Sequence, residues 1–177
     1  MATANNWVIS STGVGSVTLG RPLPREWLGE GLEARYEVRY VADGQPMEAF
    51  AFETPPLTVV LEGGPFTREA ETEPIEPNAD SYRVAAARAA RQGTAVRAVL
   101  VRGPGPATAA GIGVGSKLEA LRAAYPDLSM RAVPPMLGED ECVAESAGLP
   151  HVRFIFRSCE AASSGASVLR IDVWPAG

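Results

Sequence analysis

The sequence predicts an α+β domain made mostly of antiparallel β-sheet, with short helices after two glycine-rich motifs. Several short segments alternate apolar and charged residues, as half-buried strands do. Tight-turn residues separate consecutive segments, which favours antiparallel pairing. Two glycine-rich stretches each run into a segment with helical spacing. A chain of 177 residues is long enough for its own core, so we expect a single domain spanning residues 1–177.

The first glycine-rich motif, residues 13–28, is a fainter copy of a motif in the second half of the chain. Gly20 and Leu23 repeat the spacing of Gly115 and Leu118, and each pair opens a short helical segment. The two motifs suggest two half-domains of similar plan, or one motif used twice. Their sequences differ too much to establish a duplication.

Three strands are predicted next, joined as an antiparallel meander. They cover residues 35–41, 47–52 and 57–61, with turn residues at 43–44 and 63–65. Residues 66–80 then carry five carboxylates and two prolines, without the spacing of a calcium-binding loop. We therefore expect an exposed acidic loop, followed by a surface helix at 82–91 that ends at Gly93.

The central motif of the chain, residues 110–125, is a glycine-rich approach to an amphipathic helix. Its glycines are Gly111, Gly113 and Gly115. Ser116 is placed to cap the helix, and Glu119 to reach back in a capping box. Leu118 and Leu121 fall on one face, and Pro126 ends the helix. The spacing fits neither a phosphate-binding loop nor a dinucleotide fingerprint, so we interpret it as a structural turn.

Further strands are predicted at 95–101, 142–146, 152–157 and 168–174. Cys142 and Cys159 enclose a predicted β-hairpin with a turn at 148–150. Together with His151 they would give a metal only three ligands, in no known zinc spacing, so no metal site is expected. The cysteines either form a disulfide, which we favour, or remain as buried thiols. A disulfide would indicate an oxidising compartment.

The composition excludes several classes of function. The net charge of −5 argues against a nucleic-acid partner, and no apolar run approaches the length of a membrane span. The first residues show no export signal as written. His151 is the only histidine, and no serine lies in a G-x-S-x-G elbow, so hydrolase chemistry has no support. We expect no enzyme, no catalytic residues and no cofactor.

The order of motifs resembles the RpoE-regulated lipoprotein family of the bacterial envelope, exemplified by YfeY. The resemblance rests on segments 13–15, 35–52, 96–101, 111–125, 141–142, 151–156 and 171–174. It implies a periplasm-facing domain anchored to the outer membrane, with no known ligand or reaction. Relative to that family, residues 66–94 look inserted. The family's second cysteine follows the central helix, whereas here the candidate partner of Cys142 is Cys159. No lipid-attachment cysteine is present at the amino terminus of this chain.

The leading expectation is a non-enzymatic envelope domain that binds a protein partner or supports an envelope assembly. The alternative is a small-ligand binding domain with a cleft between the sheet and the central helix. Clustering of Trp7, Trp27 and Trp174 in one pocket would favour this alternative. A contiguous exposed apolar patch would favour the partner-binding function.

Overall fold

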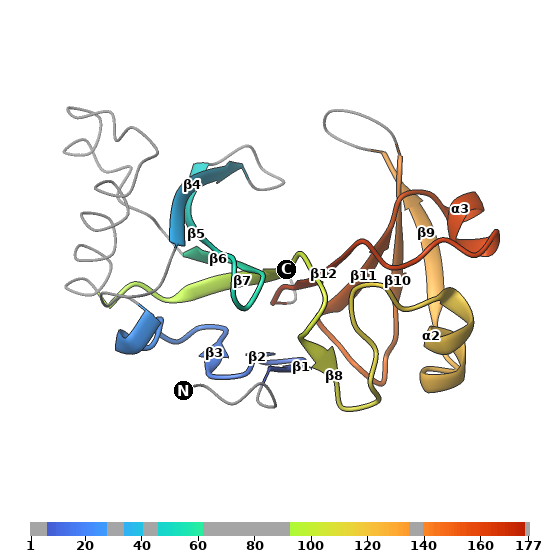
Figure 1. Ribbon diagram of the computed structural model, residues 1–177, viewed down its shortest axis with the longest axis horizontal. Coiled ribbons are helices and arrows are strands. Elements are labelled where there is room, and N and C mark those ends of the chain that lie inside the picture. Colours follow the sequence, from blue (N-terminus) through green and yellow to red (C-terminus); the bar gives the residue numbers. More distant parts are fainter. Residues whose placement is uncertain (1–6, 28–33, 41–45, 62–92, 135–139, 176–177) are drawn as a thin grey trace.

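The computed structural model describes residues 7–27, 34–40, 46–61, 93–134 and 140–175 (Figure 1). The predicted turns at 43–44 and 63–65 and the helix at 82–91 lie outside these residues. Almost all of the predicted insertion at 66–94 also lies outside the described residues. The insertion and the single-domain assignment both stay predictions.

An eight-stranded, wholly antiparallel sheet forms the main body of the fold. Its strand order is β4-β5-β6-β7-β12-β11-β10-β9. The strands are β4 (Ala34–Tyr40), β5 (Pro46–Phe52), β6 (Leu57–Leu61), β7 (Val96–Val101), β9 (Ser129–Val133), β10 (Glu141–Glu145), β11 (Val152–Phe156) and β12 (Arg170–Val173). The predicted meander of the first three strands is confirmed, and so is the mostly antiparallel character of the fold.

Among the described residues, a smaller four-stranded sheet and three short helical segments accompany the main sheet. The small sheet has the order β3-β2-β1-β8, in which only the β1·β8 pair is parallel. These elements are β1 (Val8–Ser10), β2 (Gly13–Val14), β3 (Val17–Thr18), the 3-10 turn η1 (Arg25–Trp27), β8 (Ala107–Thr108), α2 (Leu118–Ala124) and α3 (Cys159–Ser163). Figure 1 shows α2 and α3 beside the β9–β12 half of the main sheet.

The hydrophobic core lies between one face of the main sheet and these smaller elements. The main sheet contributes four fully buried phenylalanines, Phe50, Phe52, Phe154 and Phe156. The covering elements contribute Ile9, Val17, Trp27, Leu118 and Leu121 to the same cluster. Removal of these apolar side chains from water is the main force that holds the two layers together.

The strand order divides the main sheet into two halves of the same plan. Strands β4–β7 follow one another in one half and β9–β12 in the other, and the halves meet at the antiparallel β7·β12 pair. A short helical segment precedes each half, η1 before β4 and α2 before β9. Two half-domains of similar plan are therefore present in the structure, although η1 is a 3-10 turn and not an α-helix.

The predicted capping box at the start of α2 is wrong. The N-cap residue is Lys117, and no side chain caps the helix. The Ser116 hydroxyl instead accepts a hydrogen bond from the backbone N–H of Gly113, at 3.1 Å. Ser116 therefore stabilises the glycine turn that precedes the helix, and Glu119 has no reciprocal cap to complete.

Candidate functional site

An open groove of about 450 Å³ lies between α2 and α3. Its lining residues are Lys117, Leu118, Glu119 and Arg122 from the α2 side, and Ala162, Ser163 and Gly165 from the α3 side. Leu118 and Ala162 are buried and supply apolar surface, whereas the charged residues are exposed. The groove thus combines a small apolar base with a charged rim.

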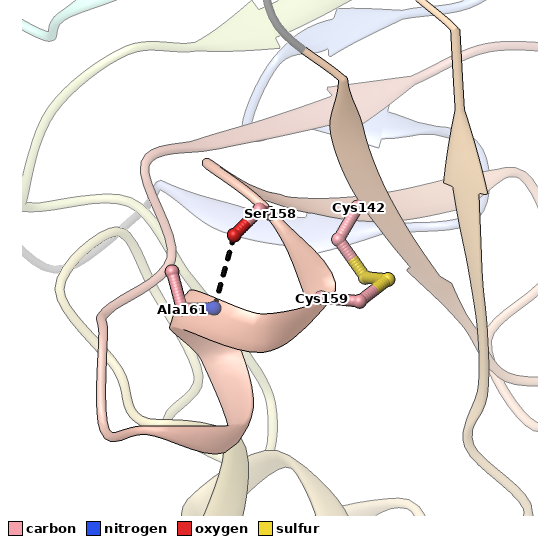
Figure 2. The surroundings of a disulfide bond; sticks show 4 residues. All are labelled: Cys142, Ser158, Cys159 and Ala161. Carbon is pink, nitrogen blue, oxygen red and sulfur yellow. Dashed lines mark hydrogen bonds between the residues drawn. A yellow bond between two sulfur atoms is a disulfide. The ribbon is translucent and has the colours of Figure 1, made fainter.

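The α3 wall of the groove is fixed to the main sheet by a disulfide (Figure 2). The bond joins Cys142, buried in β10, to Cys159, the first residue of α3. The predicted disulfide is therefore present, and the free-thiol alternative is wrong. The Ser158 hydroxyl caps the helix by accepting a hydrogen bond from the Ala161 N–H at 3.0 Å. A five-residue helix is too short to persist alone, so these attachments hold it in place.

The α2 wall is fixed by backbone hydrogen bonds at the glycine turn. Gly115, with φ of 97°, donates its N–H to the Val168 carbonyl at 2.9 Å. The N–H of Val168 donates in turn to the Ser116 carbonyl at 2.8 Å. Across the groove, the Lys117 ammonium donates to the Gly165 carbonyl at 2.6 Å. The α2 wall is therefore tied to the segment that leads into β12 and, through Lys117, to the α3 wall.

The other glycines of the central motif shape the turn and do not line the groove. Gly111 has φ of 81° and donates its N–H to the Thr108 carbonyl. A Cβ at Gly113 would lie 2.8 Å from the Pro106 carbonyl oxygen, so only glycine fits there without a shift. These contacts support a structural role for the motif. Of the three glycines, Ser116 and Glu119, only Glu119 lines the groove.

The face of the main sheet opposite the core carries ion pairs along β9, β10 and β11. Arg131 on β9 and Arg153 on β11 both approach Glu145 on β10, with Nε to carboxylate oxygen distances of 3.4 Å and 3.0 Å. The Arg131 side chain is 57% exposed. Exposed pairs of this kind contribute little to stability, about 0–1 kcal/mol each.

A second group of charges on the same face is more buried. The Arg170 guanidinium donates to Asp172 at 2.7 Å and to Glu141 at 3.3 Å. Burial raises the pKa of the Asp172 carboxyl, although the hydrogen bond and charge of Arg170 act in the opposite direction. Burial alone would lower the pKa of Arg170, but its pairing with Asp172 and Glu141 outweighs this and raises it. The geometry is that of a structural ion-pair cluster.

The three tryptophans do not gather in one pocket. Trp7 packs edge-on against Trp27, with ring centroids 5.1 Å apart, on the core side of the main sheet. Trp174 packs elsewhere, against a separate cluster of Ala49, Val60 and Ala98. Leu118 and Leu121 of the central helix pack into the core cluster. The groove described above lies between α2 and α3, with Leu118 in its lining.

His151 lies in the β10–β11 turn with φ of 68°, and its Nδ1 is 3.2 Å from the Ser11 carbonyl oxygen. Within the described ranges, no three His, Cys, Asp or Glu side chains are arranged to hold a metal ion. In the same part of the chain, no helix has the length and apolar character needed to cross a membrane.

Comparison with known proteins identifies a solved structure with a similar fold. No protein-family profile matches the sequence, and no curated protein matches it. The protein nevertheless has an α+β fold that is found among solved structures. The uncharacterized protein YfeY from Escherichia coli matches 95% of this chain and 99% of its own chain, with a TM-score of 0.55 and 12% sequence identity. The expected YfeY-like fold is therefore confirmed, and at this identity the match concerns the fold alone.

Proposed function

We propose that this chain is a non-enzymatic extracytoplasmic domain that binds a protein partner at the α2–α3 groove. The observation that carries the proposal is the attachment of both walls, by the Cys142–Cys159 disulfide on one side and the Gly115–Val168 hydrogen bonds on the other. A preorganised site loses little entropy when a partner binds. The apolar base and charged rim match the layout of a small protein interface.

The compartment is inferred from the disulfide, because such bonds form and persist in oxidising environments. A location on the periplasmic side of the outer membrane, through an amino-terminal lipid anchor, is the finer part of the proposal. It rests on the resemblance to the envelope lipoproteins. The acidic net charge of −5 also favours a protein partner over nucleic acid.

A small ligand in the same groove is the second candidate. The volume of about 450 Å³ falls within the range of known ligand pockets, which favours this candidate. The groove is open, however, and its rim is mainly charged, which a protein surface complements more readily. A thermal-shift screen with small metabolites separates the two, since only a ligand-binding groove gives a concentration-dependent rise in Tm that Arg122→Glu removes.

The partner is tested by photo-crosslinking in intact cells of the source organism. A photoreactive residue at position 119 reports on the groove, and one at Arg35, whose side chain is 63% exposed on β4, is the matched control. We expect a discrete protein adduct from position 119 that is lost in the Arg122→Glu background, and none from position 35. Equal adducts from both positions, or none from position 119, would overturn the proposal.

A further inference from the structure

β9 is an edge strand of the main sheet, with β10 beside it on one side. It pairs with β10 on one side, and no other described strand pairs with it. Ser129, Arg131 and Ala132 are exposed, and Met130 and Val133 are half-buried. The outward N–H and C=O groups of such a strand can accept a further strand by main-chain hydrogen bonding.

The side chains of β9 define which strand would fit. Side chains alternate between the two faces of the sheet, so Met130 lies on the core face. Arg131 lies on the opposite face, which carries the ion pairs and is called the ionic face below. Met130 packs against the core cluster from the edge of the sheet. An apolar side chain on an added strand would cover it.

Arg131 has an incomplete set of charge partners. Its contact with Glu145 is 3.4 Å long, and Glu145 is shared with Arg153, which it approaches more closely at 3.0 Å. An acidic side chain of an added strand, placed on the ionic face, would give Arg131 a carboxylate partner of its own. β10 already shows this pattern on the inner side of β9, with Ala144 opposite Met130 and Glu145 beside Arg131.

We propose that β9 binds an extended segment of a partner protein by strand addition, and that this segment alternates apolar and acidic residues. The apolar residues cover Met130 and Ala132, and an acidic residue pairs with Arg131. The surface is separate from the α2–α3 groove, so this inference does not depend on the proposed function.

A second copy of this chain fits the same edge less well. Full antiparallel overlap of two β9 strands about a two-fold axis places Arg131 opposite its own copy. Like charges directly opposite each other destabilise a strand pair. The favoured occupant is therefore a partner segment and not a β9–β9 dimer.

The test uses a synthetic peptide, acetyl-Val-Glu-Val-Glu-Val-Glu-Val-amide, and its counterpart with lysine in place of glutamate. Binding to the full chain is followed by NMR of backbone amides, with hydrogen exchange of residues 129–133. The variant is Arg131→Glu. Arg35→Glu, on the opposite edge strand β4, is the matched control. Both side chains are largely exposed, so both variants should fold.

We expect the glutamate peptide to shift and protect alternate amides of 129–133. Arg131→Glu should weaken that binding about tenfold and shift the preference to the lysine peptide, whereas Arg35→Glu should have no effect. Equal binding by Arg131→Glu, or shifts confined to residues outside 129–133, would overturn the proposal. It would also be overturned by a concentration-dependent dimer that protects β9 without peptide, or by no binding at millimolar peptide.

Discussion

Gly20 and Gly115 occupy equivalent positions in the turns that precede the two halves of the main sheet. Both have positive φ, 72° and 97° respectively. Gly20 donates its N–H to the Val96 carbonyl at 2.8 Å, and Gly115 donates to the Val168 carbonyl at 2.9 Å. Each valine N–H donates back to the carbonyl of the residue after the glycine, at 2.8 Å in both halves. These hydrogen bonds tie each glycine turn to the chain that enters a central strand, β7 or β12.

We therefore predict similar losses of stability for Gly20→Ala and Gly115→Ala. A Cβ at either position meets nothing within 4 Å, so the cost comes from the left-handed backbone alone and should be about 1–2 kcal/mol. Urea unfolding measures it. Gly148→Ala is the control, because that glycine lacks a positive φ and its Cβ would sit at 3.4 Å from the Ser146 hydroxyl. Losses no larger than that of the control would show that the two turns are not under backbone constraint.

Two arginines on the ionic face, Arg170 and Arg131, should differ in how much they contribute to stability. Arg170→Met leaves Asp172 almost buried without its cation, and we expect a loss of about 2 kcal/mol, less than for a fully buried pair. Arg131→Met removes a contact of 3.4 Å from an exposed side chain and should cost less than about 0.5 kcal/mol. Chemical denaturation of both variants checks the ranking. Equal losses would contradict the assignment of Arg170 as the structural member.

Asp127 connects the segment after α2 to the β10–β11 turn. It accepts hydrogen bonds from the Ser146 hydroxyl at 2.6 Å and from the Ala147 N–H at 2.8 Å. The hydrogen bond from Ser146 is the main cause that lowers the pKa of Asp127 below its ordinary value of 3.8.

The stability that the Asp127 carboxylate contributes is therefore present above pH 3.8 and is lost as the pH falls through its lower folded pKa. Asp127→Asn should be less stable than wild type near neutral pH, and the difference should shrink in this acid range. Thermal unfolding between neutral pH and pH 2 measures it. Glu119→Gln removes a carboxylate without touching the turn and serves as the control. A constant difference at all pH values would refute the assigned role of the charge.

The disulfide should stabilise the fold by constraining the unfolded chain. For a sequence separation of 17 residues, we expect Cys159→Ser to cost about 3 kcal/mol. Reduced wild type should unfold at the same urea concentration as the variant. An unchanged midpoint in both would show that the bond does not stabilise the fold.

Most of the main sheet could be predicted from sequence, because its strands have strong patterns. Residues 57–61 are apolar or β-branched, with Thr58 as the one polar residue, and form β6 with those bounds. β9 was missed, because an exposed edge strand has no alternation to detect. α3 was missed because five residues give no helical period, although Ser158 before Glu160 was a cap signal in the sequence.

The candidate groove could be predicted only in part. Cys142, Cys159 and Glu119 were identified from the sequence, and they lie in or support the groove. Lys117, Arg122 and Ser163 were not assigned to a site, because their proximity depends on α3 folding back beside α2. The capping role of Ser116 was wrong, because its hydroxyl bonds to Gly113 within the turn. Such a competition between two nearby backbone donors cannot be decided from residue spacing.

The proposed extracytoplasmic location and the fixed α3 wall both depend on the state of Cys142 and Cys159 in the cell. Intact cells of the source organism are treated with an alkylating reagent under denaturing, non-reducing conditions, and the protein is mapped by mass spectrometry. We predict a single linked pair of peptides that carries Cys142 and Cys159, with neither cysteine alkylated until a reductant is added. Alkylation of both cysteines before reduction would place the protein in a reducing compartment and contradict the proposal.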